Sequence, residues 1–128
     1  MPFSADRYWS FDYGPAHFVM LDQYVDYAVG SPQYTWLVND LAASTKIWKF
    51  IVMHEQGWST GGGHENNTTV QTIIQPLAEL YGVSIVFGGH NRYYARAVVN
   101  GVQHLTVGGG GAPLYTPDPG QPFIVTAS

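Results

Sequence analysis

The sequence predicts a single α/β domain over residues 1–128. Short apolar segments rich in β-branched and aromatic residues alternate with two stretches whose apolar residues recur every three to four positions. The last third instead holds two β-type segments around a tight-turn signal. A chain of 128 residues has the length of one domain. We therefore expect the order β-α-β-α-β, followed by an antiparallel hairpin.

The first strand and helix are predicted in the first third of the chain. Residues 16–21 form a short apolar run typical of a strand. Ser31 is a suitable N-cap, and Pro32 suits the first helical position because its missing N–H needs no partner there. The helix would present one apolar face, formed by Tyr34, Leu37, Val38 and Leu41.

The middle third repeats this pattern. Residues 47–53 and 83–87 are nearly continuous apolar runs, so we expect strands buried on both faces. Pro76 predicts a kink or restart in the helix between them, and Gly82 predicts a left-handed end. The apolar face of this second helix comprises Val70, Ile73, Ile74, Leu77 and Tyr81.

The C-terminal third is predicted to be β structure. Segments 94–99 and 102–107 flank Asn100-Gly101, a pair that tolerates positive φ and favours a two-residue hairpin turn. Residues 123–126 read as a final short strand.

Two predicted strands each contain a histidine, and a glycine run follows the second of these strands. A two-residue turn places His104 opposite Ala97, and we expect His104 and His17 to be half-exposed sheet residues. The run 108–111 lacks the Gly-Lys-Ser/Thr ending of a phosphate-binding loop. We expect it to permit close backbone approach near the strand ends.

Composition excludes several classes of protein. There is no cysteine, so a disulfide framework and a thiolate metal site are excluded. The net charge of −4 argues against non-specific nucleic-acid binding. No run approaches the roughly 18 apolar residues of a membrane helix. Residues 1–7 lack a basic stub followed by an apolar run, so we expect no signal peptide.

The low fraction of charged residues predicts association with a partner or a second copy. Only 11% of the residues are charged, against roughly 25% in an average soluble domain, while 15% are aromatic. Small domains have much surface per volume. We therefore expect an exposed apolar patch that a partner or a second copy covers, with a homodimer as the favoured form. The alternative is a solvated surface rich in tyrosine.

Two histidines occupy the position where open α/β sheets bind ligands, just past the carboxyl ends of strands. His54 follows the strand that ends at Met53, and His90 follows the strand that ends at Phe87. If the strands are neighbours, both imidazoles can converge on one divalent ion, for which neutral imidazole is a good ligand. The alternative is that each histidine caps a strand end by hydrogen bonding.

Three segments, 8–18, 52–55 and 81–96, occur in the order found in calcineurin-like metallophosphoesterases. The sequence most resembles the purple-acid-phosphatase branch, in which a strand ends in a metal-binding histidine and a Gly-His-x-His block comes later. The resemblance implies half of a metallophosphoesterase β-sandwich with flanking helices and a C-terminal β-hairpin, equivalent to the C-terminal half of that domain.

The resemblance also implies a reduced metal site. The family's earlier Asp-x-His, Gly-Asp-x-x-Asp and Gly-Asn-His blocks are not found here, and Arg92 stands where Gly-His-x-His has its second histidine. Carried over, His54 and His90 match the two histidine ligands of a single divalent ion. That ion would be zinc, with manganese or iron as alternatives.

The remaining site residues stay open at this point. A catalytic zinc usually has three protein ligands, and the candidates for the third are His64, Glu55, Asn91 or a residue of a second subunit. His64 is also a candidate catalytic residue, or a mobile loop histidine. Arg92 would hold a phosphate bidentately as a catalytic residue, or fill the vacated metal site with positive charge.

Together these observations predict a metal-dependent phosphoester hydrolase, a phosphatase or phosphodiesterase acting on a small phosphorylated substrate. Its activity is expected to be weak because the earlier metal-binding blocks are missing. The alternative is a non-catalytic half-domain that acts as a binding or assembly module.

Overall fold

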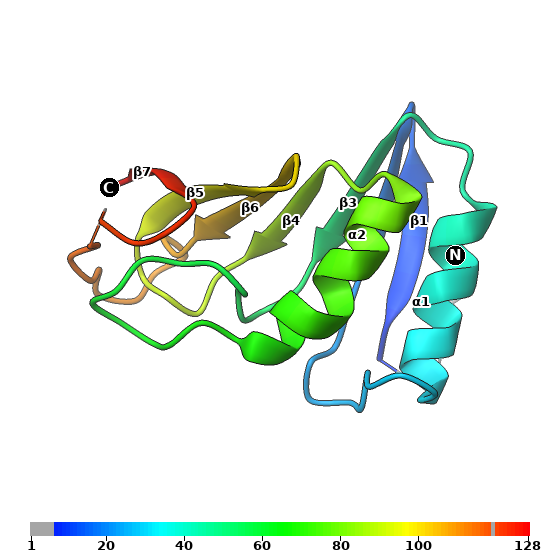
Figure 1. The fold of residues 1–128 in the computed structure, drawn as a ribbon, viewed down its shortest axis with the longest axis horizontal. Coiled ribbons are helices and arrows are strands. Elements are labelled where there is room, and N and C mark those ends of the chain that lie inside the picture. The colour runs from blue at the N-terminus through cyan, green and yellow to red at the C-terminus, as the bar shows by residue number, and fades with distance from the viewer. Residues whose placement is uncertain (1–6, 119) are drawn as a thin grey trace.

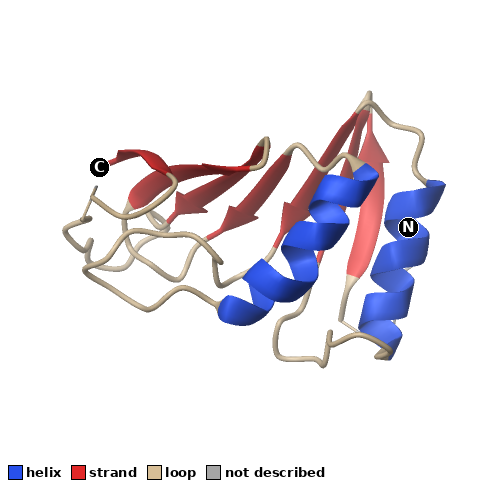
Figure 2. Ribbon diagram, viewed as in Figure 1, coloured by secondary structure: helices blue, strands red, loops and turns tan. Residues whose placement is uncertain are grey.

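The computed structural model describes residues 7–118 and 120–128. Within them the chain forms one mixed sheet of seven strands with all of its helices on one face (Figures 1 and 2). The strand order is β1-β2-β3-β4-β6-β5-β7. The elements are β1 (Trp9–Tyr13), β2 (Ala16–Met20), α1 (Pro32–Ala43), β3 (Trp48–Val52), the π-helix η1 (Val70–Ile74), α2 (Gln75–Tyr81), β4 (Ile85–Gly88), β5 (Tyr94–Val99), β6 (Val102–Val107) and β7 (Ile124–Ala127).

The α/β fold class is confirmed, and so are the signals that predicted its local structure. Strands β2, β3, β4 and β6 are parallel, and β1, β5 and β7 are antiparallel to their neighbours. The Tyr34 N–H donates to the Ser31 hydroxyl at the start of α1. Asn100 and Gly101 both have positive φ at the β5–β6 turn, and Gly82 ends α2 with φ 69.

The second helix restarts where Pro76 predicts. Its first five residues are π-helical, and the N–H of Gln75 donates to the carbonyl of Val70. Pro76 has no N–H to continue this ladder, so α2 begins there as a new helix with proline in its first turn. The expected restart is confirmed, but the wider π-turn is not readable from the apolar spacing.

Strand β1 is an edge strand that the apolar runs do not predict. It pairs antiparallel with β2 through a turn at Gly14, whose φ is 55. Its polar and aromatic residues alternate because its two faces differ: Trp9 and Phe11 contact other rings, whereas Ser10 bonds to Asp40 of α1 on the helix side.

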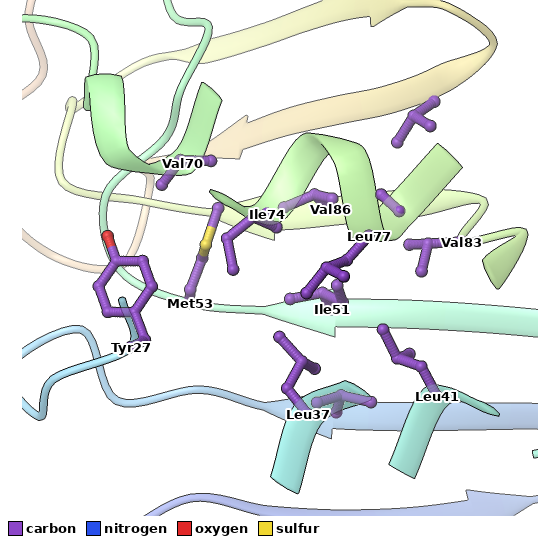
Figure 3. Close-up of a cluster of buried hydrophobic side chains, with 13 residues drawn as sticks. Tyr27, Leu37, Leu41, Ile51, Met53, Val70, Ile74, Leu77, Val83 and Val86 are labelled. Carbon is purple, nitrogen blue, oxygen red and sulfur yellow. The ribbon is translucent and has the colours of Figure 1, made fainter. Parts of the chain in front are cut away.

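The main core lies between the helices and one face of the sheet (Figure 3). Val19, Ile51 and Val86 stand side by side on β2, β3 and β4 and are fully buried. Leu37 and Leu77 are among the helix residues that cover them. Each strand therefore contributes alternate residues to this core.

The expectation of strands buried on both faces is wrong. In β3 and β4 only alternate residues are buried. The opposite face carries partly exposed rings that contact one another across four neighbouring strands: Phe11 stacks on Phe18 with centroids 5.0 Å apart, and Phe18 meets Phe50 at a tilt with centroids 5.1 Å apart. This aromatic face consists of Trp9, Phe11, Phe18, Phe50 and Phe87. Aromatic stacking, not helix packing, accounts for the second set of apolar residues in each run.

The expectation that His104 is half-exposed is also wrong. It lies opposite Ala97 as predicted, but it is fully buried on the helix side of the sheet. Its Nε2–H donates to the Gln75 side chain of α2 at 2.7 Å. Burial lowers the pKa of His104 to about 4, so the ring is neutral near pH 7.

His17 is buried as well, contrary to expectation. Its two ring nitrogens lie 2.6 Å from carboxylate oxygens of Asp12 and Asp40, which also accepts a bond from the Ser10 hydroxyl. This cluster fastens α1 to β1 and β2, so His17 has a structural position.

Arg96 donates to Gln103 at 3.4 Å, in keeping with the partly exposed position it occupies on β5.

Two expectations concern membranes and targeting. None of the helices in the described part of the chain has the length and apolar character needed to cross a membrane. The stretch on which the expectation of no signal peptide rests lies, except for Arg7, outside the described residues.

Candidate functional site

Two histidines meet at the carboxyl ends of the neighbouring parallel strands β3 and β4. The backbone ladder continues past both strands: the Met53 N–H donates to Phe87 at 3.0 Å, and the Gly89 N–H donates to His54 at 2.9 Å. As a result, Nε2 of His54 lies 3.0 Å from Nδ1 of His90, with ring centroids 4.8 Å apart. Two imidazoles on one tetrahedral zinc ion at 2.0–2.1 Å would have nitrogens about 3.3 Å apart. The two nitrogens share one hydrogen bond, at a spacing that is close to that of shared ligands.

The backbone at His90 directs its ring into this position. His90 has φ 64, and the Asn91 N–H donates across it to the Gly89 carbonyl at 2.7 Å, which makes a γ-turn. A non-glycine residue with positive φ is strained and occurs often at functional sites. The turn places consecutive side chains on opposite sides, with His90 partly exposed and Asn91 buried.

The surroundings of His90 lower its pKa, which favours a role as a metal ligand. Burial lowers the pKa of His90, and its neighbours His64 and His54 lower it further. The neutral imidazole is therefore favoured, and this is the form that binds metal ions.

A side-chain amide holds the backbone that carries His54. The Oε1 atom of Gln23 accepts from the N–H groups of His54, at 2.8 Å, and Glu55, at 2.5 Å, while its Nε2 donates to the Glu55 carbonyl. Gln23 lies in the loop after β2, 31 residues from His54. No sequence pattern predicts this contact, because it joins two irregular segments.

The third histidine of the cluster stacks on the second. The ring of His64 lies on the ring of His90, with centroids 3.7 Å apart and planes 22° apart. A nitrogen lone pair lies in the plane of its ring, so two nearly parallel stacked rings do not point at one ion. The structure therefore brings together all three imidazoles, but only His54 and His90 have nitrogens that converge.

The loop of His64 is packed against two other segments. A Cβ atom on Gly63 would lie 2.3 Å from Oδ1 of Asn91, and one on Gly62 would lie 2.3 Å from the Thr116 carbonyl. Gly61 also forms a β-bridge with Asp118. Gly62 and Gly63 are thus required for this close approach.

The other third-ligand candidates of this chain, Glu55 and Asn91, have hydrogen-bond partners within the protein. One carboxylate oxygen of Glu55 accepts from Asn67 at 2.7 Å, and both ends of the Asn91 amide are bonded within the protein. Across residues 7–118 and 120–128, no three or more His, Cys, Asp or Glu side chains are spaced to hold a metal ion.

Arg92 lines the same cleft, which has a volume of about 310 Å³ and also includes His54, His90 and Gly108. The guanidinium lies 4.0 Å over the ring centre of Tyr115 and donates to its hydroxyl, while the Tyr115 N–H donates to the Arg92 carbonyl. No carboxylate forms an ion pair with Arg92 among the residues that the structure describes. The cleft therefore carries a positive charge.

Gly108 confirms part of the expectation for the glycine run. A Cβ atom there would lie 2.0 Å from the Asn91 carbonyl, and the Gly108 N–H donates to Tyr93. Gly109 and Gly110 face open space, so close approach explains only the first glycine of the run. Tyr115 was not predicted, because it lies 23 residues from Arg92 in an irregular segment.

The chain resembles known proteins in sequence and in fold. No family model matches the chain. Purple acid phosphatase 22 of Arabidopsis thaliana is 33% identical over 120 residues, which cover 84% of this chain and 28% of that protein. The chain is homologous to part of the purple acid phosphatases. It spans about a quarter of the length of these relatives.

Solved structures support the fold of this purple acid phosphatase homologue. A purple acid phosphatase from yellow lupin (Lupinus luteus) seeds matches 96% of the chain, using 26% of its own, with a TM-score of 0.79 and 22% identity. GAP50, the anchor in the inner membrane complex of Plasmodium, matches 94% of the chain, using 42% of its own, with a TM-score of 0.67 and 18% identity. The fold is thus that of a partial metallophosphoesterase domain.

Proposed function

We propose that this purple acid phosphatase homologue is a metal-dependent hydrolase of small phosphate esters. The observation that carries the proposal is the 3.0 Å approach of the His54 and His90 nitrogens at adjacent strand ends. Homology supports a divalent metal in general, because purple acid phosphatases use a dinuclear metal centre. The positive charge of Arg92 in the same cleft suits an anionic substrate.

His54 and His90 would hold one divalent ion, which we propose to be zinc, with manganese or iron as alternatives. These residues fit the ion as a pair of nitrogen ligands, and they provide two of the three protein ligands that a catalytic zinc usually has. A divalent ion held there would supply Lewis acidity to a phosphoryl oxygen and would make a water molecule more acidic. Because only two of the three usual protein ligands are provided, we expect weak binding of the ion and weak hydrolytic activity.

Arg92 and His64 would act on the substrate itself. Tyr115 orients the guanidinium of Arg92, whose parallel N–H groups can donate to two phosphoryl oxygens and stabilise charge that develops there. The exposed ring of His64 can donate a hydrogen bond or a proton to the ester oxygens.

The test is hydrolysis of an aryl phosphate monoester and diester with zinc, manganese or iron added in turn. His54→Ala and His90→Ala should each lower kcat/KM at least about 100-fold, and metal affinity should fall in parallel. Arg92→Ala should raise KM, while Arg96→Ala is the matched arginine control outside the cleft. Activity unchanged in both histidine variants would exclude this site.

The second candidate function is a non-catalytic binding or assembly module. Two observations favour it: an arginine stands beside only two converging ligands, and the fold is shared with a protein described as an anchor. Elemental analysis of protein purified without chelator decides between the two functions. A metal-free protein without detectable hydrolysis would support the module, and bound metal with turnover would support the enzyme.

A further inference from the structure

The side chain of Asn91 makes an unusual set of contacts next to the histidine cluster. Its Oδ1 accepts from the His64 N–H at 2.5 Å, and its Nδ2 donates to the His64 carbonyl at 3.1 Å. Nδ2 also donates to the Ser59 hydroxyl at 2.8 Å. The carboxamide thus pairs with both backbone groups of one residue, as a neighbouring strand would.

The surroundings of Asn91 make this pairing specific. Asn91 is only 3% exposed and Ser59 only 2%, so the bond between them forms away from solvent, where an unpaired amide is costly, while the two bonds to His64 are partly buried. Gly63 leaves room for the amide, since a Cβ there would collide with Oδ1. The γ-turn at His90 turns the Asn91 side chain inward, toward the loop of His64.

As a consequence, the ring of His64 is held in a fixed position relative to the ring of His90. His90 and Asn91 are consecutive residues, so the backbone that presents His90 also holds the backbone of His64. The ring of His64 then lies face to face with that of His90, which leaves its nitrogens directed away from an ion shared by His54 and His90.

We propose that Asn91 is a positioning residue that fixes His64 on the face of His90 as a substrate-facing group and not as a metal ligand. The role assigned to His64 rests on the proposed function, whereas the positioning itself does not.

The positioning is tested in the metal-free full chain by NMR. Stacking shifts the carbon-bound ring protons of His64 and His90 upfield. Asn91→Ala should return the His64 signals to those of an exposed histidine. Asn91→Asp keeps the size and the Oδ1 acceptor but loses both donors, and should give a smaller change in the same direction. Ser59→Ala removes one bond to the same amide and should leave the signals unchanged.

The folded state of each variant is checked by thermal denaturation, and if Asn91→Ala does not fold, the isosteric Asn91→Asp decides. Histidine signals unchanged in the asparagine variants, or changed equally in Ser59→Ala, would overturn the proposal.

Activity provides the second readout. Asn91→Ala and His64→Ala should each lower kcat about 10- to 100-fold with little change in KM or zinc affinity, and the double variant should lose no more than the single ones. Additive losses, or loss of zinc affinity in His64→Ala, would overturn it. A wild-type chain that hydrolyses no ester removes the proposed function, and the NMR result then decides the positioning role alone.

Discussion

The two faces of the sheet differ in how they are stabilised, although they are built by alternate residues of the same strands. The helix side holds fully buried aliphatic residues such as Ile51 and the buried histidines His17 and His104. The aromatic face holds partly exposed rings such as Phe50 that stack on one another. An apolar run in a strand therefore does not by itself imply burial on both sides.

The largest expected difference comes from adjacent residues of β3. Ile51→Ala should lower the free energy of unfolding by about 3 kcal/mol, because it leaves a cavity beneath the helices. Phe50→Ala should cost about 1 kcal/mol, mainly lost ring contacts. Urea denaturation of both variants measures the contrast. Equal losses would mean that both faces are equally buried in solution.

The pH dependence of stability tests the burial of His104 on the helix side of the sheet. His104 has a pKa of about 4 in the fold and its ordinary value of 6.5 when unfolded. As the pH falls from about 6.5 to about 4, the unfolded chain takes up a proton that the native state excludes, and up to about 3 kcal/mol of stability should be lost. Denaturation at several pH values measures this loss, and His104→Gln should flatten it in that range. An unchanged slope in the variant would contradict the assignment.

The histidine between two carboxylates should matter for stability in a way that the exposed His64 does not. His17→Asn cannot reach both Asp12 and Asp40 and should cost about 2 kcal/mol. His64→Asn, at an exposed ring, should change stability by no more than about 0.5 kcal/mol. Thermal unfolding of the two variants tests this. A His64→Asn variant as unstable as His17→Asn would show that His64 also supports the fold.

Association of two copies through the aromatic face stays a prediction. If a second copy covers this face, the wild-type chain should sediment at twice its mass of 14.1 kDa. Phe50→Lys should sediment as a monomer, with the same loss of stability of about 1 kcal/mol that is expected for Phe50→Ala. A wild-type monomer at micromolar concentration would remove the homodimer.

The sequence predicted those features that depend on local rules. Periodicity predicted α1 and the parallel strands, and the Asn100-Gly101 pair predicted the hairpin. The approach of His54 to His90 was foreseeable because parallel neighbours end at the same edge. Strand β1 was missed because an alternating edge strand lacks a continuous apolar run.

The rest of the site could not be read from the chain. Gln23, Asn91 and Tyr115 reach their partners across 23 to 32 residues, between loops whose paths no periodicity describes. Asn91 was considered as a metal ligand, but its neighbours show an amide that pairs with backbone. His104 was misjudged because strand alternation shows which residues share a face, but not which face the helices cover.

The bond from the Gly89 N–H to the His54 carbonyl links the two histidine loops into one unit. A cation that binds there would meet the nitrogens of His54 and His90 already held at a fixed spacing, so binding would cost little conformational entropy of the chain. The same bond offers a probe of that readiness: hydrogen exchange at the Gly89 amide should be slow in the apo chain and should speed up only when the ends of β3 and β4 separate.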